Sequence, residues 1–390
     1  MRTTQRTPAM GASTRRTRRL TVLPAAALAV LALLAGACTP APEAGPEQVV
    51  AGIVDAVERL RGHDFLEEPV VEFVDPATFE ADVLADLASR EASIAADRTA
   101  FVALDWIDAS QDLLTEYRKT YGGGVVGYYD PSDATLRVRG TELTPYRREV
   151  VAHELTHALD DQLFDLSGLD SDGLLDEEYL AQLVAIEGSA ERVRSRYAAS
   201  FGPFETLQSL AEQLEAGSDP ELLTIPITLL TLTSAPYLAG VRFQRELAAE
   251  LGDPEGIDLS LTRYPANTEQ GFDPAKYLAD EPAEEVPAPP TDAGAPVVRS
   301  GEFGPLLISL VLREGIVLDE VDPVASGWNG GSYTSWESAI GACIRVDTRW
   351  DGPDDAAAVR AAFTSWGSAH GGTTVLSPSP VEVRFTRCDT

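Results

Sequence analysis

The spacing of apolar residues predicts helices over most of the region 47–121. Apolar side chains recur at helical spacing in 47–60 and along one face of 76–96. A further helix or helix pair is expected from about 99 to 121. Between the first two helices, the β-branched run 70–74 is typical of a short strand.

The pattern then changes to a β-hairpin followed by two long helices. Strand-forming residues at 125–129 and 135–139 flank a segment with turn chemistry. Thr144-Pro145 is typical of a helix cap followed by proline at the first helical position. We therefore expect one helix from there to about Phe164, and a second from about 177 to 200.

The second half of the chain is predicted to be mostly helical to about Leu251 and then mixed. The segment 281–300 is rich in proline and acidic residues, so a solvated loop is expected there. In 301–390, helices are predicted at 305–313 and 355–366, with strands around 341–346 and 381–385. The fold class is therefore predicted to be α+β and mainly helical, with 47–200 and 201–280 as two halves around one cleft.

Composition excludes some partners. The 390 residues include 30 Lys+Arg and 62 Asp+Glu, for a formal net charge of −32. Such a chain is expected to bind no nucleic acid, because phosphate binding needs a cationic face. The sequence contains no internal repeat and no glycine-rich phosphate-binding loop.

The N-terminal residues predict export. Residues 1–19 carry six arginines and no acidic residue, and an apolar run follows at 20–35, too short for a permanent membrane span. Small residues directly before Cys38 resemble a bacterial lipobox. We therefore expect 1–37 to be a signal peptide, Cys38 to carry lipid, and 38–46 to tether the protein to the extracytoplasmic face of the cell membrane. Secretion without lipidation is the alternative. Because the N-terminal arginines occur in pairs, export through the twin-arginine route is considered beside the general secretory (Sec) route.

Two cysteines remain beyond Cys38. In an oxidising compartment Cys343 and Cys388 are expected to form a disulfide, although two buried free thiols are the alternative.

The motif His153-Glu154-Leu155-Thr156-His157 is the clearest chemical signal in the chain. Histidines four residues apart lie on one face of a helix and can bind one Zn²⁺. Glu154 points roughly 100° away from His153, so it is placed as a general base beside the metal instead of as a ligand.

A catalytic zinc needs a third protein ligand, and Glu187 is the leading candidate. It lies mid-way along the next predicted helix, in a largely apolar stretch where a carboxylate is costly unless it is paired or metal-bound. The alternatives are that Glu191 or Asp176 is the ligand, or that Glu187 is a surface residue. The metzincin extension is excluded, because Asp160 and Leu163 stand where it requires glycine and histidine.

Supporting groups can be proposed around these ligands. Asp161, one turn after His157, is expected to accept a hydrogen bond from a zinc-bound histidine, with ordinary solvation as the alternative. Tyr237, Tyr264 and Arg242 are candidate oxyanion stabilisers, with Tyr237 named first although the sequence does not single out any of the three.

These motifs together resemble the gluzincin metallopeptidases, and more closely a group of exported bacterial proteins of that type. The resemblance implies a zincin-like core, with a β-hairpin before the active helix and a second helix that carries a zinc-binding glutamate. It also implies zinc-dependent peptide hydrolysis. Two positions depart from the family pattern, Asp273 where histidine is usual and Gly331 where an acidic residue is common. The segments that carry the resemblance are Gly127–Pro131, His153–Gln162, Glu187–Ala190 and, more weakly, 236–240, 268–270 and 327–330.

The leading hypothesis is a cell-envelope zinc endopeptidase that acts on a peptide or protein. A zinc-binding scaffold lipoprotein without turnover is the alternative, although an intact Glu154 beside the metal is unnecessary for that role. A solute-binding lipoprotein would show two similar lobes, and the sequence has no such repeat.

Overall fold

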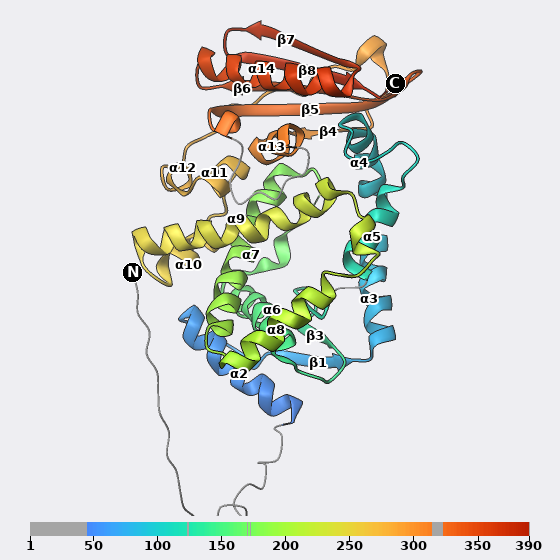
Figure 1. Ribbon diagram of the computed structural model, residues 1–390. Coiled ribbons are helices and arrows are strands. Elements are labelled where there is room, and N and C mark those ends of the chain that lie inside the picture. The colour runs from blue at the N-terminus through green and yellow to red at the C-terminus, as the bar shows by residue number, and fades with distance from the viewer. Residues whose placement is uncertain (1–44, 123–124, 170, 172, 314–322, 390) are drawn as a thin grey trace, which may run out of the picture. The chain divides into compact units, whose positions relative to one another are not determined.

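The fold combines many helices with two small sheets, which confirms the predicted mainly helical α+β class (Figure 1). The computed structural model describes residues 45–122, 125–169, 171, 173–313 and 323–389. The predicted signal peptide, Cys38 and nearly all of the tether lie outside these residues. Among the described helices, none has the length and hydrophobicity needed to cross a bilayer.

The N-terminal part contains α2 (Pro46–Arg61) and a three-stranded sheet. In this sheet β3 (Thr135–Arg139) is central, with β1 (Val70–Val74) parallel on one side and β2 (Gly127–Asp130) antiparallel on the other. The predicted strands and hairpin are therefore present. Within the described residues β2 pairs with β3 alone, so its other edge is not covered by a further strand.

The prediction of one continuous helix over 76–96 is wrong. The structure has α3 (Pro76–Ser89) and α4 (Glu91–Ala103), separated by Arg90, whose φ of −96° and ψ of 2° are not helical. The break allows Leu87 before it and Ile94 after it to enter the same apolar core. The following helix, α5 (Leu113–Gly122), is short.

Helix α6 (Pro145–Phe164) has the predicted start and end. The Thr144 hydroxyl accepts a hydrogen bond from the Arg147 N–H, and Asp165 closes the helix in a left-handed conformation. One face of α6 packs on α2 and β3 through an apolar cluster. That packing fixes the rotation of α6, so the opposite face presents its histidines to the cleft. The cluster contains Ile53, Val57, Leu136, Val138, Val151, Ala152, Leu155, Leu159 and Val193.

Helices α7 (Glu177–Ala198) and α9 (Ile227–Leu251) pack directly against each other. A Cβ atom built on Gly188 of α7 would lie 2.5 Å from the carbonyl oxygen of Gly240 in α9. The two backbones therefore touch where both helices have glycine and no side chain separates them.

Gly240→Ala is expected to lower the free energy of unfolding by about 1–3 kcal/mol, because the new methyl group has no space between the backbones. Gly52→Ala is the matched control. Gly52 also lies within a helix, but a Cβ there would meet nothing within 4 Å. That variant should be more stable by roughly 0.5–1 kcal/mol. Urea denaturation of both variants checks this, and equal effects would contradict the close contact.

The C-terminal part is a five-stranded antiparallel sheet in the order β4-β5-β6-β8-β7, with α14 (Pro353–His370) packed against it (Figure 1). The predicted disulfide is present: Cys343 and Cys388 face each other on neighbouring strands, with their sulfurs 2.00 Å apart. Strands β4, β5 and β7 were not predicted. The strands are β4 (Arg299–Glu302), β5 (Trp328–Ser338), β6 (Gly341–Trp350), β7 (Thr373–Ser379) and β8 (Glu382–Cys388).

Shorter helices connect these parts. They are α8 (Pro203–Ala216), α10 (Glu255–Thr262), α11 (Thr268–Phe272), α12 (Pro274–Leu278) and α13 (Pro305–Arg313). The acidic, proline-rich segment before β4 has little regular structure, as predicted, but it is attached to β5. The Glu284 N–H donates to the Asn329 carbonyl at 2.7 Å, and the Ser332 hydroxyl donates to the Pro287 carbonyl at 2.9 Å.

Glu177, at the start of α7, joins that helix to the C-terminal part. Its carboxyl group is buried and accepts hydrogen bonds from the N–H and the hydroxyl of Thr268. Burial and the nearby Glu302 raise the pKa of Glu177 to about 8. The folded protein therefore retains a proton that the unfolded chain releases near pH 4.5.

Between pH 5.5 and 7.5, we expect the free energy of unfolding to fall by about 1 kcal/mol per pH unit because of this group. The sign follows because the folded state binds more protons than the unfolded state there, and so loses stability as pH rises. Glu177→Gln should flatten this dependence, as measured by denaturation across the range. An unchanged slope in the variant would contradict the assignment.

Candidate metal centre

The two histidines of the motif point to one place. His153 and His157 lie one turn apart on α6, and their Nε2 atoms are 3.0 Å from each other. His153 is buried, whereas His157 is partly exposed to the cleft. The helical spacing therefore brings both nitrogens together at the cleft wall, as predicted.

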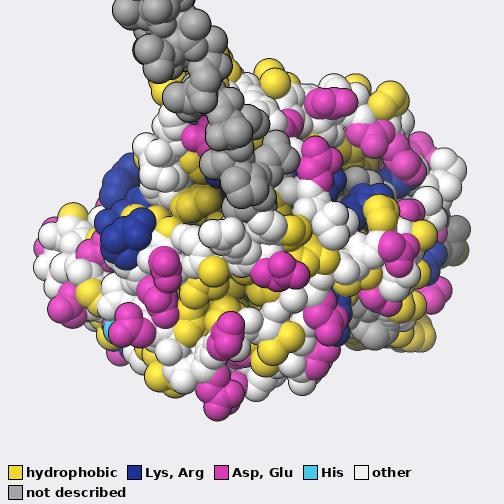
Figure 2. All heavy atoms as spheres, turned by 90° about the horizontal axis from the view of Figure 1, so that it is seen from below, with side chains coloured by type: hydrophobic (Ala, Val, Ile, Leu, Met, Phe, Trp, Pro, Cys, Tyr) yellow, Lys and Arg dark blue, Asp and Glu magenta, His cyan; other side chains and the backbone are white. Residues whose placement is uncertain are grey.

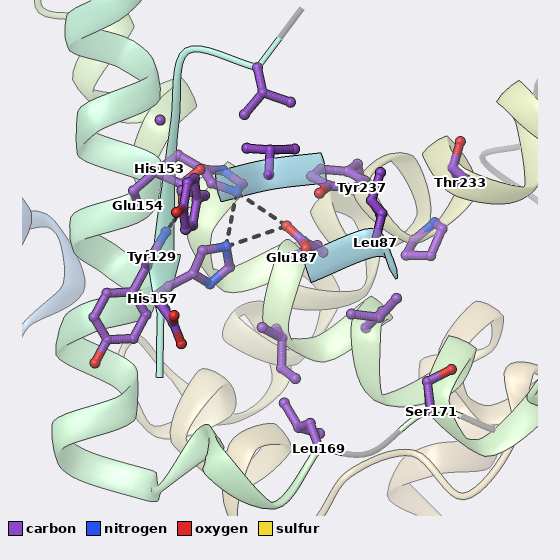
Figure 3. Close-up of a pocket in the computed structure, with 18 of the residues that line it drawn as sticks. Leu87, Tyr129, His153, Glu154, His157, Leu169, Ser171, Glu187, Thr233 and Tyr237 are labelled. Atoms are coloured by element: carbon purple, nitrogen blue, oxygen red, sulfur yellow. Dashed lines mark hydrogen bonds and ion pairs between the residues drawn. The ribbon is translucent and has the colours of Figure 1, made fainter. Parts of the chain in front are cut away.

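Glu187 approaches the same place from α7. Its Oε2 atom is 3.1 Å from His153 Nε2 and 3.5 Å from His157 Nε2. Figure 3 shows the three side chains converging, with dashed lines joining their tips. The group can hold one metal ion.

The spacing fits zinc. Two donors that each lie about 2.0–2.1 Å from a tetrahedral zinc are roughly 3.3 Å apart. The three distances of 3.0, 3.1 and 3.5 Å bracket that value. Two imidazoles and one carboxylate are also a donor set that zinc commonly takes, and they leave a fourth position for another ligand.

The charges around the group favour a cation. Burial would lower the pKa of His153, but Glu187 and Glu191 outweigh it and raise that pKa to about 10. Burial would raise the pKa of Glu187, but the two histidines outweigh it and hold that pKa well below its usual range. The cluster thus stabilises positive charge, which a proton or a metal ion can supply.

Glu154 is partly buried beside this group and lines the cleft without pointing at the centre of the group (Figure 3). Its Oε2 atom accepts a hydrogen bond of 2.9 Å from the Tyr129 N–H of β2. Burial raises the pKa of Glu154, so the carboxylate binds a proton more readily than an exposed glutamate does. These are the properties required of a general base.

Asp161 contacts the hairpin and a loop. Its Oδ2 atom accepts from the Tyr129 hydroxyl at 2.6 Å, and its Oδ1 atom accepts from the Leu166 N–H at 2.7 Å. It therefore holds Tyr129, and with it β2, against α6. The predicted bond from a histidine to Asp161 stays a prediction.

Glu191 occupies the position expected of a carboxylate that supports a ligand. Its Oε1 atom is 3.2 Å from His153 Nδ1, close enough for an ion pair although not aligned as a hydrogen bond. Arg194 donates to the same carboxylate at 2.8 Å. Sequence reasoning considered Glu191 only as an alternative ligand. The other alternative, Asp176, caps α7 by accepting from the Tyr179 N–H.

A buried network behind the ligands was not predicted. Asp160 accepts from the Ser189 hydroxyl at 2.6 Å and from Arg61 at 2.8 Å. Arg61 is fully buried and also pairs with Asp258 of α10. Because Asp160 and Ser189 follow His157 and Glu187 closely in sequence, their bond fixes the relative positions of α6 and α7 near the ligands.

The ligands lie in a cleft of about 1410 Å³. Tyr237 of α9 lines it, with its ring nearly parallel to that of His153 and 5.9 Å away. In Figure 3, Tyr237 lies beside Glu187. Glu154 lies near the opposite edge of the site. Of the other candidates, Arg242 donates to the Phe272 carbonyl, and burial raises the pKa of Tyr264 to about 12. Neither is among the described residues that line the cleft.

Comparison with known proteins touches only the C-terminal part of the chain. Residues 294–388 match a family described as a domain of unknown function, DUF8575. This stretch contains β4 to β8 and excludes every candidate metal ligand. No curated protein and no solved structure matches the chain.

Proposed function

We propose that the protein is a zinc metallopeptidase of the gluzincin type, with a zincin-like core formed by the hairpin, α6 and α7. The observation that carries this proposal is the convergence of His153, His157 and Glu187 on one point beside Glu154, which also lines the cleft. When bound, zinc lowers the pKa of water and polarises a carbonyl group. Glu154 accepts a proton from the attacking water and returns it to the leaving amine.

Strand β2 supports the proposal as a substrate-binding edge. The Tyr129 N–H points away from β3 towards Glu154, so the backbone groups of Gly127, two residues earlier, point to the same side. Both residues line the cleft. An extended peptide can add to this edge as another antiparallel strand, which brings its backbone past the ligands.

Tyr237 is proposed to stabilise the developing oxyanion, since it lines the cleft and lies next to Glu187. Tyr237→Phe is expected to reduce kcat by roughly 100-fold with little change in KM, because the lost hydrogen bond forms only in the transition state. Steady-state kinetics with a fluorogenic peptide measures both constants. A change in KM alone would assign Tyr237 to substrate binding instead.

Export is proposed together with the catalytic role. The Cys343–Cys388 disulfide supports an extracytoplasmic location, because such bonds persist in oxidising compartments. Lipidation of Cys38 is the proposed means of attachment to the membrane.

The proposed function is tested by incubating the purified protein with a peptide library and identifying cleaved bonds by mass spectrometry. The metal-stripped protein serves as the control, followed by zinc reconstitution. Cleavage that disappears on stripping and returns with zinc supports the peptidase. Stoichiometric zinc without any cleavage would instead favour the binding or scaffold role.

A further inference from the structure

Helix α8 (Pro203–Ala216) is oriented the opposite way from an ordinary surface helix. Surface helices normally bury an apolar stripe and expose a polar one. Here Phe204, Leu207, Leu210 and Leu214 are 87%, 64%, 52% and 66% exposed. We call these four residues the α8 apolar face.

The polar stripe of α8 is what contacts the body. Glu205 pairs with Arg148 of α6 at 2.6 Å, and the Ser209 hydroxyl donates to Glu149 at 2.5 Å. Glu212 accepts from the Tyr146 N–H at 3.2 Å. At about 100° per residue, this stripe lies roughly opposite the apolar face. Ion pairs and hydrogen bonds therefore hold α8 with its leucines outward.

Four large apolar side chains exposed on one face of a helix are typical of an interaction site. Three members of this face, Phe204, Leu207 and Leu214, follow with Ala211 the alternating three- and four-residue spacing of a coiled-coil seam, which accepts a second helix. Figure 2 views the lower end of the body, where α8 lies in Figure 1, and shows hydrophobic side chains interspersed with acidic ones.

The negative charge of the protein determines which kind of partner can bind the α8 apolar face. Helix α8 contains three glutamates and no basic residue, and the whole chain carries a net charge of −32. A second copy of the chain and an anionic lipid surface are both repelled by this charge. An amphipathic polypeptide segment can pack its apolar residues on the seam, while basic residues beside them are attracted to the negative charge.

The C-terminal end of α8 also borders the cleft. Gln213, Ala216 and Gly217, at the C-terminal end of α8, line the same cleft as the metal ligands. A polypeptide that binds along α8 and continues past its C-terminal end therefore reaches the cleft.

We propose that the α8 apolar face is an exosite that binds a basic amphipathic segment of the polypeptide substrate. The identity of that polypeptide as a substrate rests on the proposed peptidase function. Binding to α8 itself requires neither the metal nor turnover.

The test uses the full chain with Glu154→Gln, so that bound peptide is not cleaved. The probe is a labelled 14-residue helical peptide of leucine and lysine, and its leucine–glutamate counterpart is the charge control. The α8 variant is Leu207→Gln/Leu214→Gln. The matched control is Ile340→Gln/Leu376→Gln, two leucine-sized side chains of similar exposure, 62% and 55%, of which Ile340 lies in the turn between β5 and β6 and Leu376 in β7.

Fluorescence anisotropy should show that the lysine peptide binds and the glutamate peptide does not. The α8 variant should bind roughly 100-fold more weakly, about tenfold for each leucine, whereas the control variant should bind like the parent. Equal binding by the α8 variant would overturn the proposal. So would α8-dependent dimerisation in sedimentation, or α8-dependent binding to phosphatidylcholine vesicles, if the lysine peptide does not bind.

A second arm separates the exosite from the peptidase. With Glu154 intact, a fluorogenic peptide is compared with the same peptide extended by the leucine–lysine segment. The preference in kcat/KM for the extended substrate should be lost in the α8 variant and kept in the control variant. Binding without any preference would overturn the exosite role. Binding with no cleavage of either substrate would overturn the peptidase while leaving α8 as a binding surface.

Discussion

Replacing Glu154 with glutamine is expected to reduce peptide hydrolysis by roughly 100- to 10,000-fold, the usual contribution of a general base. The amide is nearly the same size and can still accept the hydrogen bond from the Tyr129 N–H, so the site should keep its shape. It cannot accept a proton. Zinc content should remain at about one ion per chain, because Glu154 is not among the three converging residues.

Kinetics with a fluorogenic peptide and elemental analysis of the same sample check this result together. A variant that loses its zinc would contradict the separation of base from ligands. A variant that retains full activity with zinc bound would show that another group accepts the proton.

Replacing Glu187 with alanine should have the largest effect on metal binding. Its carboxylate is one of three donors, and without it the two histidines hold the ion alone. The matched variant is Glu191→Ala, on the same helix one turn later, whose carboxylate faces the other nitrogen of His153. We expect Glu191→Ala to weaken zinc binding roughly 10- to 100-fold and Glu187→Ala to weaken it considerably more.

Competition with a chromogenic chelator measures both affinities, and circular dichroism establishes that each variant is folded. Equal losses would mean that the two carboxylates share one role. A larger loss for Glu191→Ala would assign the third ligand to that residue and exclude the geometry described above.

The strongest local signals in the sequence predicted the centre of the site. Thr144 and Pro145 define where α6 begins, and the four-residue spacing of His153 and His157 follows from helix geometry alone. Glu187 was predicted because a carboxylate in an apolar helical stretch needs a partner, and the structure supplies two histidines.

Tertiary contacts decided what the sequence could not. The break at Arg90 spans one residue and lies within a continuous helical pattern. Strand β5 is buried along nearly its whole length, so it lacks the alternation that identifies a half-exposed strand.

The sequence also could not predict the orientation of some side chains. Glu191 follows Glu187 by one helical turn, so the sequence alone does not distinguish a ligand from a supporting carboxylate. The structure does, because Glu191 faces His153 Nδ1 and not the Nε2 atom at the centre of the site. The periodicity of α8 shows two faces without showing which is buried, because that depends on Arg148 and Glu149 of another helix.

The central claim is that His153, His157 and Glu187 bind one zinc ion. The most direct measurement is an anomalous difference map, collected at the zinc absorption edge, from crystals of the zinc-loaded protein. We predict one peak in the cleft, about 2.0–2.1 Å from the Nε2 atoms of both histidines and from a carboxylate oxygen of Glu187. A peak bound to other side chains, or a Glu187 carboxylate turned away from the two rings, would contradict it.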